Sequence, residues 1–426
     1  MSFNTALSGM NAAQSDLNVT SNNIANVNTA GFKFSRAEFG DIFATSSLGS
    51  SRTAIGSGVL LANVSQQFSQ GNLEFTANTL DMAISGDGFF VLNASVDNAN
   101  QIFSRAGEFG VDSTGFVVNN SGARLQVFPV NTDGTVTTTS LSGTIDLQLP
   151  QTAGAPSPTT ELDLGINLPA TAPGLNVNNF DPTVATSFTR STSASIFDSL
   201  GESHIMTIYY VKDAAVSNSW AAYYYVDGNP VDITGGTAGA GGQLFNRINF
   251  NDSGAFVNTV PASPSTAPLG FTNGSDPTQT VNIDYANNEP TQFASAFTVN
   301  SLDQDGFSIG RLAGIEISET GVIRANFTNG QSDAIGKIAL ARFANVQGLA
   351  QLGNNSWSDT IDSGEPLAGE ALTGSFGQVR SGAIESSNVD LTGELVNLIT
   401  SQRNFQANAR TIETNNTITE TVIQIR

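Results

Sequence analysis

The sequence predicts a mainly β protein with α-helical termini and concentric, nested domains. Three observations support this: apolar side chains recur with a seven-residue spacing at each end, apolar and polar residues alternate between the ends, and Ser, Thr, Asn and Gly are abundant. The 426 residues are 39% hydrophobic and 12% charged, against roughly 25% charged in an ordinary globular protein. Such a composition favours strands and turns over long surface helices.

The first helical segment is expected over residues 1–30. Its apolar side chains follow steps of four and three along one stripe, namely Phe3, Leu7, Met10, Leu17 and Ile24. The segment ends in the Asn-rich stretch SNNIANVNTAGFKFSR, Ser21–Arg36. Asn26, Asn28 and Gly31 tolerate turn and left-handed backbone conformations, so they are expected to terminate the helix.

A second helix of the same type is expected within residues 386–426. Ser387 or Asn388 is predicted to cap its start, and its stripe consists of Leu391, Leu395, Leu398, Phe405, Ile412 and Ile423. An isolated helix of about 25 residues is only marginally stable in water. Each stripe therefore needs another helix, and the two termini are expected to pair as a coiled coil. An ordinary two-helix cap on a globular domain is the alternative.

Between the helices the pattern is that of β-structure. Short alternating strands surround a Gly-Asp-Gly turn within Leu80–Leu92, and further turns are expected at 112–115 and 119–122. Residues rich in Pro and small side chains, 151–174, mark a boundary. We therefore expect a linker at 31–71, a β-rich middle domain at 72–150 plus 292–385, and an inserted β-rich outer domain at 151–291. This order keeps the chain ends together.

The bulk properties exclude several classes of protein. The net charge of −21, with only 16 basic residues, argues against a nucleic-acid partner, because phosphate binding needs clustered Lys and Arg. The sequence contains no Cys, which removes disulfides and thiolate sites. No apolar run approaches about 18 residues, so no membrane insertion is expected. No secretory signal pattern is visible, so any export of the chain is expected to proceed without a cleaved signal peptide.

No catalytic, cofactor-binding or metal-ligating residue is predicted. His204 is the sole histidine, and its alternating context places it in a strand with Met206, Ile208 and Tyr210 on the same face. A histidine-based metal site would need further ligands, which no second His or Cys supplies. The segment DQDG at 303–306 lacks the later ligands of a calcium loop. The chain is therefore expected to be no enzyme and to use no cofactor.

Several segments resemble the bacterial flagellar axial protein family of rod, hook and hook-associated subunits. The N-terminal segment SNNIANVNTAGFK contains that family's signature, with Asn22, Asn23, Ile24, Ala25, Asn26, Asn28, Gly31, Phe32 and Lys33. SSNVDLTGELVNLITSQRNFQANARTI resembles the C-terminal signature, and LDMAISGDGFFVL resembles the shared β region. FDSLGESHIMTIYY and FANVQGLAQLGNNSW are similar to the hook members in particular.

The resemblance implies a structural role and a set of partners. Many copies would assemble into the curved hollow tube of the hook, with the terminal helices around a central export channel, and this tube would transmit torque as a flexible joint. The implied partners are further copies of the chain, rod, hook-cap and hook–filament junction proteins, and the flagellar type III export apparatus. The implied location is the flagellum outside the cell, at the distal end of the basal body.

Two further expectations concern charges and alternatives. Lys33 and Arg36 are expected either to pair with Glu38 and Asp41 of another copy or to remain solvated. The alternative functions from other classes are a secreted β-rich adhesin or surface-binding protein and an acidic extracellular hydrolase.

Overall fold

The computed structural model describes residues 2–42, 56–95, 98–150 and 155–424. Two compact units divide the chain. Unit 1 consists of Met1–Gln151, Gly314–Asn326 and Ser332–Arg426, and unit 2 of Thr152–Ala313 and Phe327–Gln331. The predicted fold class is confirmed: the chain is mainly β, with one helix near each end, and these two helices pack together in unit 1.

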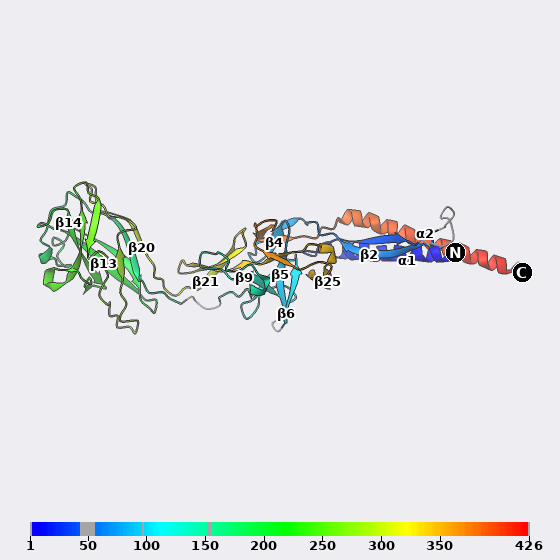
Figure 1. Cartoon of the computed structure of the whole chain (residues 1–426), viewed down its shortest axis with the longest axis horizontal. Helices are drawn as coiled ribbons and strands as arrows, with labels where there is room; N and C mark the ends of the chain where they lie inside the picture. The colour runs from blue at the N-terminus through cyan, green and yellow to red at the C-terminus, as the bar shows by residue number, and fades with distance from the viewer. Residues whose placement is uncertain (1, 43–55, 96–97, 151–154, 425–426) are drawn as a thin grey trace. The chain divides into compact units, whose positions relative to one another are not determined.

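Helix α1 (Ser2–Ala25) and helix α2 (Leu391–Gln424) lie side by side, blue and orange to red in Figure 1. Strands β1 (Ser35–Asp41) and β2 (Val59–Gln66) form an antiparallel pair against α1. The start of α2 is capped by Asp390, whose Oδ1 accepts the Thr392 N–H at 3.0 Å. The predicted caps Ser387 and Asn388 are wrong, because the aspartate lies nearest the first exposed helical N–H groups.

The body of unit 1 is a sheet in the order β21-β22-β23-β9-β5-β6-β26-β25, with β7, β8, β10, β24 and β27 attached to it. Its strands are β5 (Phe89–Ser95), β6 (Asn98–Ser104), β7 (Gly110–Val111), β8 (Val117–Val118), β9 (Arg124–Phe128), β10 (Ile145–Asp146), β21 (Leu312–Ile317), β22 (Val322–Phe327), β23 (Ser332–Ile338), β24 (Leu340–Arg342), β25 (Ala350–Gly353), β26 (Ser356–Ser358) and β27 (Leu367–Gly369). Sequence-distant strands therefore share one sheet, which ties both halves of unit 1 together.

Two small strand pairs connect this body to the start of α2. Strand β3 (Leu73–Phe75) pairs with β29 (Ala383–Glu385), and β4 (Met82–Ser85) pairs with β28 (Gln378–Ser381). The expected Gly-Asp-Gly turn separates β4 from β5, with Gly86 and Gly88 at positive φ. The expected turns at 112–115 and 119–122 also form, each closed by a backbone hydrogen bond.

Unit 2 contains two sheets around one large apolar core. One sheet has the order β12-β13-β14-β17-β16, with β15 and β18 attached, and the other has the order β19-β11-β20. The strands are β11 (Glu161–Asn167), β12 (Arg190–Phe197), β13 (Ser203–Lys212), β14 (Ser219–Val226), β15 (Asn229–Val231), β16 (Thr237–Ala238), β17 (Leu244–Phe250), β18 (Phe256–Val260), β19 (Asn282–Asp284) and β20 (Thr298–Gln304). Inward residues of both sheets, including Leu164, Ile208 and Trp220, form the core.

The path of the chain between the units differs in detail from the expected segments. Residues 292–313, assigned by pattern to the middle domain, belong to unit 2, because β20 pairs with β11 along Leu162–Asn167. The finer division into a helical part, a linker, a middle domain and an outer domain stays a prediction. Among the described residues, neither helix combines the length and apolar character needed to cross a membrane.

Candidate assembly site

The face along which α1 meets α2 is built from small and polar side chains. On α1 the buried residues are Ala6, Ala13, Thr20 and Asn23, and on α2 they include Glu394 and Ser401. They recur at steps of three and seven, so they share the seven-residue period of the apolar stripe but lie on a neighbouring stripe of each helix. The expected period is therefore observed, and the hydrogen bonds that join the two helices use residues outside the predicted stripes.

Polar contacts join the helices at seven-residue intervals, and we call this series the polar ladder. The Asn23 Nδ2–H donates to Glu394 Oε2 at 3.0 Å. One interval further, the Ser401 hydroxyl donates to the Asp16 carboxylate. At the next interval, Gly9 faces Asn408, whose Oδ1 would lie 2.8 Å from a Cβ added at Gly9. Residue numbers fall along α1 as they rise along α2, so the helices are antiparallel and in fixed register.

The predicted apolar stripes are not fully covered by this pairing. Phe3, Leu7, Leu391, Leu395 and Ile423 are exposed, together with Val396, Ile399 and Ile418 on α2. Met10, Leu17, Ile24, Leu398, Phe405 and Ile412 are partly buried. We call this set of side chains the apolar helix face. Exposed apolar side chains on a helix gain free energy when another surface covers them.

The turn after α1 forms a tight joint with the β-structure and α2. Gly31 has φ of +68°, and a Cβ there would lie 2.5 Å from the backbone nitrogen of Ala106. Asn26 and Asn28 lie in the turn that ends α1, as expected, although neither adopts the left-handed conformation. Asn26 instead donates from Nδ2 to the Asn22 carbonyl at 2.9 Å. Of these three residues, Gly31 alone combines a positive φ with this close backbone approach. Only glycine meets both requirements without strain.

Lys33 is the centre of a buried charge cluster, which contradicts both expectations for it. Its Nζ lies 2.6 Å from Glu385 Oε1 and donates to the Ser69 carbonyl at 2.9 Å, and its side chain is fully buried. Arg105 reaches the other oxygen of Glu385 at 3.3 Å. Lys33 therefore neither pairs with another copy nor remains solvated. Arg36 pairs at 2.8 Å with Glu38 of the same chain, at the surface.

The electrostatics of this cluster follow from its burial. Burial lowers the pKa of Lys33, and the adjacent Glu385 carboxylate opposes that shift. Burial likewise lowers the pKa of Arg105, again opposed by Glu385. Two cations around one carboxylate remain charged in a dry site only where the attraction offsets the loss of hydration. The arrangement therefore depends on residues 33, 105 and 385 being brought together.

The remaining signature residues divide between structural contacts and the surface. Asn23 bridges three elements, since it also exchanges hydrogen bonds with the Ser35 backbone at 2.8 and 3.0 Å. Phe32 is buried, whereas Asn22, Ala25 and Asn28 are exposed. Sequence reasoning did not predict the roles of Glu385 and Asn388. The Asn388 side chain accepts from Phe34 N at 2.7 Å and donates to the Gln67 carbonyl at 2.8 Å.

Family models match most of the chain. Residues 3–33 match the flagella basal body rod protein, 83–180 the flagellar hook protein FlgE/F/G D1 domain, 167–307 the flagellar basal body protein FlaE D2 domain, and 380–425 the flagellar basal body rod FlgEFG protein C-terminal. The flagellar hook protein FlgE of Escherichia coli K12 is 36% identical over 427 residues, with both chains fully covered. The chain belongs to the flagellar hook protein FlgE family.

More distant relatives support the same family assignment. The flagellar hook protein FlgE of Treponema pallidum is 33% identical, covering 99% of this chain and 98% of that protein. The crystal structure of Helicobacter pylori flagellar hook protein FlgE2 superposes with a TM-score of 0.53 at 15% identity, over 74% of this chain and all of that one, which shows a shared fold. As a hook family member the chain is a structural component of the flagellum, and the family is not one of enzymes. The adhesin alternative has no support.

Proposed function

We propose that many copies of this chain assemble into the curved, hollow tube of the flagellar hook, with the terminal helices lining its inner wall around the export channel. The observation that carries the proposal is the apolar helix face. The polar ladder satisfies the contact within one chain but leaves Leu391, Leu395 and Val396 exposed. Neighbouring copies that cover this face gain about 25 cal/mol for each Å² of apolar surface buried.

The two kinds of helix surface suit two different tasks. Hydrogen-bonded contacts at 23–394 and 16–401 fix how one chain's helices pair. The apolar helix face is nondirectional and fits association between copies. The Ser-, Thr- and Asn-rich β units then provide small polar contacts that adjust as the tube bends. In this arrangement the inner helices transmit torque, and the outer parts allow each row of subunits to shorten and lengthen during rotation.

The proposal includes the neighbours of the hook. The matches at 3–33 and 380–425 are to rod protein segments, so the ends of this chain are suited to pack against rod subunits as they do against each other. We include hook-cap and hook–filament junction proteins as further partners, and the flagellar type III apparatus as the export route. The proposed location is outside the cell at the distal end of the basal body, reached without a cleaved signal peptide. No catalytic step is assigned.

A matched pair of valine variants tests the proposal. Val396 on α2 is 59% exposed and Val257 on β18 is 55% exposed, so Val→Asp places a charge at an equally exposed site in each unit. The full-length V396D chain is expected to need at least a tenfold higher concentration to form tubes, as measured by sedimentation and electron microscopy. V257D is expected to assemble as the native chain does. Normal assembly by a folded V396D chain would overturn the proposal.

A further inference from the structure

A tight turn in unit 2 gathers three groups able to bind a metal ion. The segment FDSLGESH joins β12 to β13, and it holds Asp198 before the turn and Glu202 and His204 after it. The Asp198 Oδ1 accepts the backbone N–H groups of Leu200 at 2.9 Å and Glu202 at 2.8 Å. These bonds fix the carboxylate of a buried aspartate in place.

The imidazole of His204 is held from two sides. Its Nδ1 lies 2.7 Å from Asp227 Oδ2, and the ring stacks on Phe271 with ring centres 3.9 Å apart. When the Nδ1 proton is donated to Asp227, the lone pair of Nε2 points away from Asp227. A histidine that ligates a metal usually donates its other ring N–H to a carboxylate in this way.

The other ring nitrogen has no hydrogen-bond partner. His204 Nε2 is buried and unpartnered within the described part of the chain, and it lies 3.6 Å from Asp198 Oδ2. A neutral imidazole nitrogen and a carboxylate oxygen both carry lone pairs, so they face each other favourably only with a proton or a cation between them. A buried polar atom left without a partner destabilises the folded chain.

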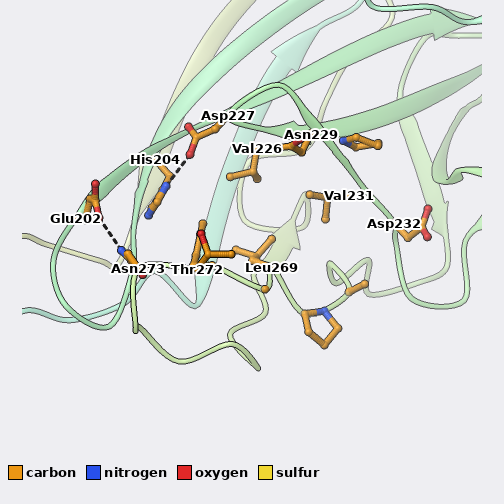
Figure 2. Close-up of a pocket in the computed structure, with 15 residues that line it drawn as sticks. Glu202, His204, Val226, Asp227, Asn229, Val231, Asp232, Leu269, Thr272 and Asn273 are labelled. Atoms are coloured by element: carbon orange, nitrogen blue, oxygen red, sulfur yellow. Dashed lines mark hydrogen bonds and ion pairs between the residues drawn. The ribbon is translucent and has the colours of Figure 1, made fainter.

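Glu202 completes the group at the edge of a cavity of about 510 Å³, where Figure 2 shows it with His204, Asp227 and Asn273. One donor atom from each of Asp198, Glu202 and His204 lies within 4.8 Å of the other two. The Asn273 Nδ2 donates to Asp198 at 2.5 Å and to Glu202 at 2.6 Å. This amide marks the point on which both carboxylates converge.

We propose that Asp198, Glu202 and His204 bind a divalent transition-metal ion of the Zn²⁺ type. Bonds of about 2.0–2.2 Å to nitrogen and oxygen place tetrahedral ligands roughly 3.4 Å apart, close to the observed 3.6 Å between His204 Nε2 and Asp198 Oδ2. The imidazole ligand favours such an ion over Ca²⁺, which takes oxygen ligands. The ion replaces the Asn273 amide between the carboxylates, and water from the cavity fills the fourth position.

The single histidine makes the test direct. Because His204 is the only His in the chain, every imidazole signal in a ¹H–¹⁵N spectrum of the full-length protein comes from this site. After treatment with a chelator and addition of Zn²⁺, the Nε2 resonance is expected to shift with saturation at one ion per chain. Isothermal titration with Zn²⁺ then measures the affinity.

Three variants complete the test. D227N removes the charge behind the ring and is expected to weaken Zn²⁺ binding 10–100-fold, while H204Q is expected to abolish it. E161Q is the control, because Glu161 belongs to a second acidic group, with Asp163 and Asp284, that contains no histidine. The E161Q chain is expected to bind Zn²⁺ as tightly as the native chain does. The proposal is overturned if the native imidazole signals do not change with Zn²⁺. Unchanged affinity in a folded D227N or H204Q chain would also overturn it.

Discussion

The ammonium group of Lys33 lies 2.6 Å from the Glu385 carboxylate, although 352 positions separate them in the chain, and both side chains are fully buried. This contact joins the turn after α1 to the last strand before α2. Neither charge has access to water, and Arg105 contacts the same carboxylate. The two ends of the chain are therefore coupled through a site in which loss of Glu385 leaves two buried cations without a counter-charge.

Replacing Glu385 by Gln is expected to destabilise unit 1 by about 3–5 kcal/mol, the usual cost of leaving a buried charge unpaired, because Lys33 and Arg105 then lack their carboxylate. Glu370 provides a matched control. It pairs with Lys337 at the same 2.6 Å, but both side chains retain some exposure. E370Q should therefore cost much less. Urea unfolding of the full chain measures both losses, and equal losses would show that burial does not determine the strength of the Glu385 contacts.

The change Asn23→Asp keeps the side-chain shape but removes the N–H that Glu394 accepts at 3.0 Å. Two carboxylates then face each other in a buried site. The expected loss is at least 1.5–3 kcal/mol, the range for hydrogen bonds to charged groups. The neighbouring change Asn22→Asp, at an exposed position, adds the same charge as a control. Thermal unfolding followed by circular dichroism at 222 nm compares the two, and the expectation fails if N22D is as damaging as N23D.

Gly31→Ala tests the joint after α1. The positive φ alone costs about 1–2 kcal/mol for a residue with a Cβ, and the added atom also meets the backbone of Ala106. Gly40 in β1 is the matched site, because a Cβ there meets nothing within 4 Å. G40A should leave stability unchanged or slightly higher. Differential scanning calorimetry distinguishes the variants, and a G31A chain with native stability would contradict the assigned backbone geometry.

Acid is expected to weaken the turns that contain Asp-x-Thr. The Thr183 side chain lowers the pKa of Asp181, and the Thr278 side chain lowers the pKa of Asp276, through hydrogen bonds to each carboxylate. A lowered pKa means that the unfolded state binds more protons between the folded and unfolded pKa values. Stability is therefore present above about pH 4, the unfolded value, and is lost as the pH falls through the folded pKa.

The double variant D181N/D276N tests this pH dependence, because Asn keeps an acceptor oxygen but does not titrate. Its urea midpoint should fall less between pH 7 and pH 3 than that of the native chain. An identical fall in both proteins would mean that other carboxylates account for the acid sensitivity.

Local features could be predicted from the sequence because they depend on local physics. The helices at both ends follow from seven-residue spacing, as between Met10 and Leu17 or between Leu391 and Leu398, and the positive φ of Gly31 follows from its position after a helix. The choice of contact face could not be predicted, since it depends on whether Asn23 or Ile24 meets the second helix. Apolar spacing cannot decide this when a stripe of small and polar residues has the same period.

Contacts between distant positions explain the other errors. The acidic residues close to Lys33 in the sequence are Glu38 and Asp41, and nothing near it indicates its actual partner, Glu385. His204 was predicted as a strand residue, and it lies on β13 as expected. Its neighbours Asp227 and Asn273 come from other turns. The sequence therefore contains one local indication of the site, the carboxylates of Asp198 and Glu202 in FDSLGESH. A tight turn between them brings these two side chains close together.

The polar ladder also determines how the helix pair responds to a pull along its axis. An interface made only of apolar side chains lets two helices slide past each other by small increments, because apolar contacts are nondirectional. Here, any slide along the axis separates Asn23 from Glu394 and Ser401 from Asp16. Other polar side chains of the series come opposite each other only after seven residues, about 10.5 Å at 1.5 Å per residue. The helix pair therefore resists small displacements along its axis, because each of them breaks the hydrogen bonds between the helices.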